Sequence, residues 1–169
     1  MKKILGSFNV TSGKVVISDP CYSEIKERSA INGLWKSYVN LNGEGRVTSL
    51  VAEYQGLVDA GAKWLRDRPE GVDSGQMSVF DSSFYRKDAE GKGKISKSWE
   101  YMEDDKDDGA FYGACCTLTC GESNGVGTPG GVLEHGVVSQ TGYGDGSYPV
   151  FLKFSGTHKR IVAIKVKFI

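Results

Sequence analysis

GVVSQTGYGDGSYPVFLKF, the stretch from Gly136 to Phe154, decides how we expect the chain to fold. An apolar run ends in the glycine-rich turn TGYGDG, and four side chains then alternate with their neighbours: Tyr148, Val150, Leu152 and Phe154. Period-two alternation after such a turn predicts a half-buried strand that leaves a tight bend. Three glycines in five residues permit positive φ angles, so we expect the turn to set the register of this strand.

The length and charge of the chain limit what it can be. Its 169 residues fit one domain that buries about two-thirds of its unfolded surface. Its 21 basic and 21 acidic residues give no net charge, so no overall field attracts nucleic acid or an anionic membrane. This balance argues against a nucleic-acid partner, although it leaves a local basic patch open.

The N-terminal segment MKKILGSFNVTSGK is too broken to be a secretory signal. Its apolar run is interrupted at Gly6 and again at Asn9, whereas a signal peptide needs about 7–15 uninterrupted apolar residues. No stretch approaches the roughly 18 apolar residues of a membrane span. We therefore expect a cytoplasmic protein whose four cysteines are reduced thiols.

Short apolar or alternating runs, separated by turns rich in glycine, recur along the chain without a visible linker or internal repeat. The predicted strands cover residues 14–18, 34–41, 46–54, 72–81, 111–120, 133–139, 148–154 and 161–169. They indicate one all-β domain over residues 1–169, mainly antiparallel, with at most one or two short helices. The expected architecture is a sandwich or a flattened barrel.

Two segments are harder to assign. Residues 46–65 also place apolar side chains at helical spacing, so a helix stays open there. We favour a hairpin, because Asn42-Gly43 between two β-rich runs is a strong turn signal. Residues 86–108 carry a block of lysines and then a block of acidic residues, which is typical of a solvated excursion.

Three of the four cysteines, Cys115, Cys116 and Cys120, lie close together in the sequence. Structural zinc sites use two closely spaced cysteine pairs, and the chain has no second pair. On a strand, Cys115 and Cys116 would point to opposite faces and could not share a metal. We interpret these cysteines as small buried apolar residues.

Cys21 is the more reactive candidate. It follows the turn that Asp19-Pro20 makes at the end of a strand, where a side chain can be presented at a rim. A nucleophilic cysteine needs a base, and the chain offers only His135 and His158. His158 falls in the tip of a predicted hairpin, residues 155–159, which leaves His135 as the candidate partner.

Two motifs suggest a bound ion or phosphate, but neither fits. In the acidic run 103–109, an EF-hand loop aligned on Gly109 would need oxygen ligands where Lys106 and Cys115 stand. The GYGDG turn is followed by a strand, not by the lysine and helix of a phosphate loop. We therefore predict no metal and no cofactor.

Three aspartates each stand beside a predicted strand end. If these ends meet, they form an acidic rim. The candidate ligand-binding residues are then Asp19, Cys21, Asp73, Gln76, Asp145 and Tyr148. Aspartate also stabilises turns through bonds to nearby backbone, and for Asp145 we expect this structural role.

Four motifs together resemble a known family. They are Asp19-Pro20-Cys21-Tyr22, Val72-Asp73-Ser74-Gly75-Gln76, Phe80-Asp81 and SQTGYGDGSYPV from Ser139 to Val150. The family consists of bacterial and phage proteins and is described only as a domain of unknown function. The resemblance implies a small β-rich intracellular domain, and it carries over no activity.

Two hypotheses of function follow. Loops rich in Gly, Asp, Tyr and Ser at strand ends are typical of recognition sites on a rigid scaffold. They favour a non-enzymatic binding module for a small polar ligand or a protein partner. The alternative is a small hydrolase that uses Asp19 or Asp145 as a base, or Cys21 as a nucleophile.

Overall fold

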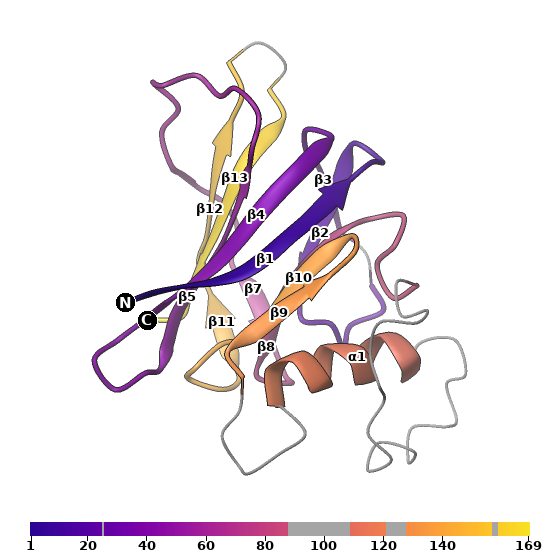
Figure 1. Ribbon diagram of the computed structural model, residues 1–169, viewed down its shortest axis with the longest axis vertical. Helices are drawn as coiled ribbons and strands as arrows, with labels where there is room; N and C mark the ends of the chain where they lie inside the picture. The colour runs from indigo at the N-terminus through magenta and orange to yellow at the C-terminus, as the bar shows by residue number, and fades with distance from the viewer. Residues whose placement is uncertain (25, 88–108, 121–127, 157–158) are drawn as a thin grey trace.

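The protein is a sandwich of antiparallel sheets (Figure 1). The computed structural model describes residues 1–24, 26–87, 109–120, 128–156 and 159–169. Its elements are β1 (Lys2–Val10), β2 (Lys14–Ser18), β3 (Glu27–Ser29), β4 (Gly33–Leu41), β5 (Val47–Tyr54), β6 (Leu65–Arg66), β7 (Glu70–Val72), β8 (Gln76–Asp81), α1 (Gly109–Cys120), β9 (Gly130–Leu133), β10 (Gly136–Gln140), β11 (Gly146–Tyr148), β12 (Val150–Phe154) and β13 (Ile161–Lys167).

Two main sheets form the sandwich. The larger has six strands in the order β1-β4-β5-β13-β12-β6, and the smaller has five in the order β3-β2-β8-β10-β9. A further pair, β7 and β11, lies beside them. Both main sheets end in edge strands within the described residues, so neither closes into a barrel. The all-β prediction is confirmed, in its sandwich form.

The core lies between the sheets and is built from the inward face of each alternating strand. Trp35 and Phe8 are fully buried, and their rings stack with centroids 6.3 Å apart across the β1–β4 pair. The Trp35 indole Nε1 donates to the Ile31 carbonyl oxygen at 3.1 Å, which satisfies its polar group. Val150 and Leu152 point into the same core, as their alternation predicts.

Residues 33–54 form a hairpin, so the helical alternative for residues 46–65 is wrong. β4 pairs with β5 along its length. The Asn42 side-chain oxygen accepts hydrogen bonds from the backbone N–H groups of Glu44 and Arg46, both at 2.9 Å. These bonds close the turn that the Asn-Gly signal predicts.

The run predicted as a strand over residues 111–120 is the helix α1, so that prediction is wrong. The sequence fits both periods, because apolar side chains also recur there at helical spacing. Phe111, Ala114, Cys115 and Leu118 pack on the outer face of the five-stranded sheet around Phe80. Burial of this stripe against β9 and β10 selects the helix over the strand (Figure 1).

Other boundaries also differ from the predictions. The N-terminal segment, for which no element was predicted, forms the edge strand β1. The predicted strand 72–81 divides into β7 and β8 at a loop where Gly75 has a φ of 67°. Residues 88–108 of the predicted excursion, with its acidic run, lie outside the described residues. No described helix is long and apolar enough to cross a membrane.

The structure reveals an internal repeat, which corrects the prediction that there is none. Residues 10–22 and 72–84 share Val, Ser, Gly and Asp at equivalent positions, with a strand between the Gly and the Asp. These strands, β2 and β8, lie antiparallel and side by side. Ile17 pairs with Val79, its own counterpart in the repeat. The two copies are therefore related by an approximate two-fold axis through this pair.

The strand of each copy leads into a fully buried aspartate that binds the loop preceding the other copy's strand. In the second copy this residue is Asp81, at the end of β8. Its Oδ2 accepts from the Thr11 N–H, the Thr11 hydroxyl and the Ser12 N–H at 2.5, 3.2 and 2.9 Å. Its Oδ1 accepts from the Ser83 N–H at 2.9 Å. Asp81 thus ties β8 to the loop before β2.

The first prediction concerns Asp81. Burial raises the pKa of its carboxyl, but the hydrogen bonds from Ser12, Thr11 and Ser83 outweigh this effect and lower the pKa below its usual value. The carboxylate therefore stabilises the fold above the unfolded-state pKa of about 3.9, and this contribution is lost as the pH falls through the folded-state pKa. We expect Asp81→Asn to cost about 3 kcal/mol at neutral pH, because an amide nitrogen then meets N–H donors.

Urea unfolding at neutral and acidic pH checks this. The difference in free energy of unfolding between the wild type and Asp81→Asn should narrow below about pH 4, where the carboxylate binds a proton in the unfolded wild type but stays ionised in the folded one. If this difference in free energy of unfolding were the same at both pH values, the interpretation of Asp81 as an ionised carboxylate that holds the loop before β2 would be contradicted.

Candidate functional site

Asp19 is the structural centre of the candidate site. It follows β2 and is fully buried, and its carboxylate accepts four hydrogen bonds. Oδ2 accepts from the backbone N–H groups of Asp73 and Ser74 at 2.8 and 2.7 Å. Oδ1 accepts from the Cys21 N–H at 2.8 Å and the Ser74 hydroxyl at 2.6 Å. These bonds occupy the carboxylate, so Asp19 anchors the loop 73–75 and is not a free base.

The three predicted aspartates do meet, and they meet at this loop. The Asp145 Oδ1 reaches across from the β10–β11 turn and accepts from the Gly75 N–H at 3.0 Å. The Asp73 Oδ2 accepts from the Tyr22 hydroxyl at 2.6 Å. Three consecutive N–H groups, those of residues 73 to 75, therefore point at aspartate oxygens from two other segments.

The glycine-rich turn itself is closed by two hydroxyl groups. Those of Thr141 and Tyr148 both donate to the Gly144 carbonyl oxygen, at 2.7 and 2.9 Å. The bond that Asp145 makes crosses instead to the neighbouring loop, so its structural role is wider than the turn cap we expected. Tyr148 also pairs with Glu70 in the β7–β11 ladder. Because Tyr148 belongs to the stretch from Gly136 to Phe154, this stretch helps to position Glu70.

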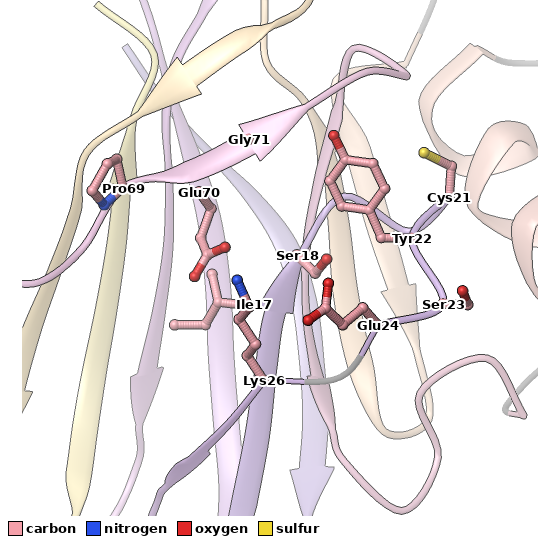
Figure 2. A pocket seen from close by; sticks show the side chains of 10 residues that line it. All are labelled: Ile17, Ser18, Cys21, Tyr22, Ser23, Glu24, Lys26, Pro69, Glu70 and Gly71. Carbon is pink, nitrogen blue, oxygen red and sulfur yellow. The ribbon is translucent and has the colours of Figure 1, made fainter.

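A cavity of about 410 Å³ lies beside this loop (Figure 2). Its lining is Ile17, Ser18, Cys21, Tyr22, Ser23, Glu24, Lys26, Pro69, Glu70 and Gly71. Figure 2 shows the carboxyl groups of Glu24 and Glu70 and the amino group of Lys26 directed into the same space. The Tyr22 ring forms one wall, and its bond to Asp73 fixes the hydroxyl end of that ring.

Arg28 holds Glu70 in place from behind. Its side chain is only 9% exposed, and its Nη2 donates to Glu70 Oε1 at 2.6 Å while its Nε donates to Asp67 Oδ2 at 2.8 Å. Charge-assisted bonds of this kind are strong and directional. Glu70 is therefore presented to the cavity with a fixed orientation, while Asp67 holds the Nε side of the same guanidinium.

The Cys21 thiol is unsuited to nucleophilic attack. Burial, a hydrogen bond to Asp19 and the charges of Asp19 and Asp73 raise its pKa to about 12. The thiol is therefore protonated at neutral pH, whereas a nucleophilic cysteine needs a lowered pKa. The hydrogen bond to Asp73, followed by burial, likewise raises the pKa of the Tyr22 hydroxyl, which stays a donor.

Gln76 and the helix cysteines lie away from the cavity. Gln76 is 4% exposed and its Nε2 donates to the Cys116 Sγ at 3.4 Å, so it faces α1. Cys115 and Cys116 are buried and form no disulfide, which confirms their interpretation as small core residues. The side chain of Cys120 lies outside the described residues. Among the described side chains, no cluster of three or more His, Cys, Asp or Glu is placed to hold a metal ion.

The structure separates Cys21 from His135, so the proposed dyad is wrong. His135 lies at the far end of β8, where its carbonyl oxygen accepts from the Asp81 N–H at 2.9 Å. Its ring stacks on Phe84 with centroids 3.5 Å apart. His158 lies outside the described residues.

Sequence reasoning thus found the loop but missed most of the cavity. Asp19, Cys21, Asp73 and Asp145 come together as one network. Tyr148 supports this network by closing the turn that carries Asp145, whereas Gln76 faces α1. Of the ten residues that line the cavity, only Cys21 was among the predicted site residues; the polar ones that were not are Ser18, Tyr22, Ser23, Glu24, Lys26 and Glu70. The repeated Ser-Gly pair could have located the loop. The polar segment 23–26 carries no pattern that would have singled it out.

Comparison with known proteins agrees with the resemblance seen in the sequence. Residues 70–166, more than half of the chain, match the family described as "Protein of unknown function (DUF4241)". The Gly-Asp-Gly turn lies inside the matched range, whereas the Asp-Pro-Cys-Tyr motif precedes it. No curated protein and no solved structure matches the chain.

The second prediction is that Cys21 reacts slowly. With a pKa near 12, its thiolate population at neutral pH should be about a thousandfold below that of an ordinary cysteine. A thiol-reactive probe should therefore label Cys21 slowly in the folded protein, and Cys21→Ser should label at nearly the same rate as the wild type. Fast labelling that disappears in Cys21→Ser would contradict the raised pKa and reopen the cysteine-hydrolase hypothesis.

The third prediction concerns Asp145. In the other copy of the repeat, the equivalent glycine N–H of Gly13 donates to the side-chain amide oxygen of Asn32 at 2.6 Å. An asparagine at position 145 can accept from Gly75 in the same way, so Asp145→Asn should leave the melting temperature nearly unchanged. Asp145→Ala removes the acceptor and should cost about 1 kcal/mol. If both variants melted alike, the Gly75 bond would contribute nothing to stability.

Proposed function

The chain belongs to the DUF4241 family, and we propose that in this member the cavity beside Tyr22 binds a small polar ligand. The protein then acts as a non-enzymatic binding module. Cys21, Cys115 and Cys116 form no disulfide, which suits an intracellular, reducing setting, in which we place the protein.

The chemistry of the lining narrows the ligand class. Glu24 and Glu70 offer carboxylates, Lys26 offers an ammonium group, and Ser18 and Ser23 offer hydroxyls. Acidic and basic groups together in one cavity are complementary to a ligand that carries both charges. We therefore propose a zwitterionic amino compound of the size of a free amino acid, whose ammonium group meets the glutamates and whose acceptor meets Lys26.

The observation that carries this proposal is the rigidity of the cavity wall. Asp19 fixes the loop 73–75, that loop presents Asp73, and Asp73 fixes Tyr22 through a 2.6 Å hydrogen bond. A binding site whose wall is already ordered loses less conformational freedom when the ligand enters. Hydrogen bonds therefore connect the buried carboxylate of Asp19, through the loop 73–75, to Tyr22 at the cavity surface.

Two observations weigh against the hydrolase alternative. The Asp19 carboxylate is fully occupied by four donors, so it has no free position from which to accept a proton from water. The Cys21 thiol has a raised pKa. The Asp19 carboxylate and the Cys21 thiol are therefore better suited to stabilising the cavity wall than to acting as a catalytic base and a nucleophile.

The fourth prediction tests the site by isothermal titration calorimetry. The panel is free lysine and glutamine as zwitterions, succinate as a dianion and glucose as a neutral polyol. We expect a zwitterion to bind, and we expect Glu24→Gln and Lys26→Gln each to weaken its affinity about tenfold or more, since each removes one charged hydrogen-bonding partner.

Glu44→Gln is the matched control, because Glu44 is an exposed carboxylate in the β4–β5 turn and does not line the cavity. It should bind as the wild type does. Binding of glucose or succinate in preference to the zwitterions would contradict the ligand class. A zwitterion affinity unchanged in Glu24→Gln and Lys26→Gln would contradict the site.

A further inference from the structure

The strands of the six-stranded sheet carry an excess of positive charge, although the chain as a whole has no net charge. They contain seven basic residues and a single acidic one, Glu53, although the chain as a whole has 21 of each. The strands of the facing sheet carry two of each sign. The excess of cations is therefore specific to one sheet.

Strand alternation places six of these cations on one surface. Inward residues such as Val150, Leu152 and Ile164 fill the core, so their neighbours in sequence point outward. The cations that lie on the outward positions are Lys2, Lys36, Arg66, Lys153, Lys165 and Lys167. We name this surface the basic face. Six strands at a spacing of about 4.8 Å make it roughly 24 Å wide.

Aromatic rings are interleaved with these cations. The Lys165 and Lys153 ammonium groups lie 4.3 and 4.8 Å from the centre of the Trp64 ring. Lys2 lies 3.5 Å from the centre of the Tyr38 ring, and Lys167 lies 5.9 Å from that of Phe151. Tyr38 and Phe151 hold outward positions on the basic face. Trp64 lies against the same face, because its two partners, Lys153 and Lys165, also hold outward positions.

The clustering of lysines affects the pKa of Lys165. Burial, and then the neighbouring charges of Lys167 and Lys153, lower the pKa of Lys165 below its usual value. Glu53 opposes this effect but does not cancel it. Like charges held close together destabilise a fold unless an anion neutralises them, so the face is complementary to a chain of negative charges.

We propose that the basic face binds single-stranded nucleic acid. A single strand presents phosphates and flat bases in alternation, which matches ammonium groups alternating with aromatic rings. A sheet face with rings set among its cations suits bases that are splayed out from the backbone, whereas a duplex hides them. An acidic protein segment would match the charges but would offer nothing to the rings of Trp64, Tyr38 and Phe151.

Recognition at this surface has two parts. The lysines contact phosphates, which gives affinity without sequence preference and makes that affinity depend on salt. As Lys153 and Lys165 turn from the Trp64 ring to a phosphate, the ring becomes available for stacking on a base. This surface shares no residue with the cavity beside Tyr22, so the two proposals stand or fall separately.

The fifth prediction is tested by fluorescence anisotropy with labelled oligothymidylate and oligouridylate of about 12 nucleotides. We expect binding at about 50 mM salt that weakens steeply by about 200 mM, with a log–log slope of roughly −2 to −4 from several phosphate contacts. Lys165→Gln and Lys153→Gln should each weaken binding several-fold and make the slope shallower. Trp64→Leu should weaken it about tenfold while leaving the slope unchanged.

Lys14→Gln is the matched control, because Lys14 is an exposed lysine on the other sheet and pairs with Glu27 at 3.1 Å. It should bind as the wild type does. Circular dichroism of each variant, with Trp64→Phe as a milder second ring variant, establishes that the fold is kept. A preference for one of the two oligonucleotides distinguishes DNA from RNA within the proposal.

Three outcomes would overturn it. One is the absence of binding to either oligonucleotide at low salt. Another is equal loss of affinity in Lys14→Gln and Lys165→Gln, which would mean non-specific attraction. The third is polyaspartate binding as tightly as the oligonucleotides with no effect of Trp64→Leu, which would identify an acidic protein segment as the occupant.

Discussion

Two buried carboxylates, one at each end of the β2–β8 pair, hold the smaller sheet in register. Removing a carboxylate from water is costly, and each of these two accepts four hydrogen bonds in compensation, three of them from backbone N–H groups. Asp19 binds the loop before β8, and Asp81 binds the loop before β2. A shift of one residue in register would break both sets at once, so the pairing is fixed from both ends.

The two ends of the β2–β8 pair share one architecture, but one end is closed and the other forms a cavity. The difference lies in two pairs of equivalent residues. At one end Thr11 turns its hydroxyl back to Asp81, and Phe84 stacks on His135. At the other end Asp73 replaces the threonine and Tyr22 replaces the phenylalanine, and the two bond to each other. The first arrangement closes the end with an aromatic stack. The second leaves fixed polar groups at the surface, and the cavity opens there.

Much of this fold was predictable, because alternation reports burial directly. The strands near Trp35 and Leu152 were recognised from that pattern, and the strand near Val15 from a short continuous apolar run. The helix α1 was not, because small residues such as Ala114 and Cys115 fit either period and only the sheet surface under them decides. The convergence of the three aspartates could only be hypothesised from the sequence, since it depends on which distant strands pair. The cavity lining was missed because its charged residues come from two segments that are far apart in the chain.

The net charge of the chain does not predict the charge of a single surface, because the geometry of strands decides which residues point outward. Alternation sends every second residue outward, so lysines spaced two apart, as Lys165 and Lys167 are, collect on one face however the rest of the chain is charged. A zero total then means only that the acidic residues lie elsewhere. In this protein two of them, Glu24 and Glu70, face the cavity, and Glu53 alone stands among the strands of the basic face. The sandwich thereby carries two surfaces of different charge: the basic face has six cations, whereas the cavity combines the carboxylates of Glu24 and Glu70 with the ammonium group of Lys26. Salt limits the reach of exposed charges to about 10 Å, so the local arrangement of charges at each surface, and not the total of the chain, decides what that surface attracts.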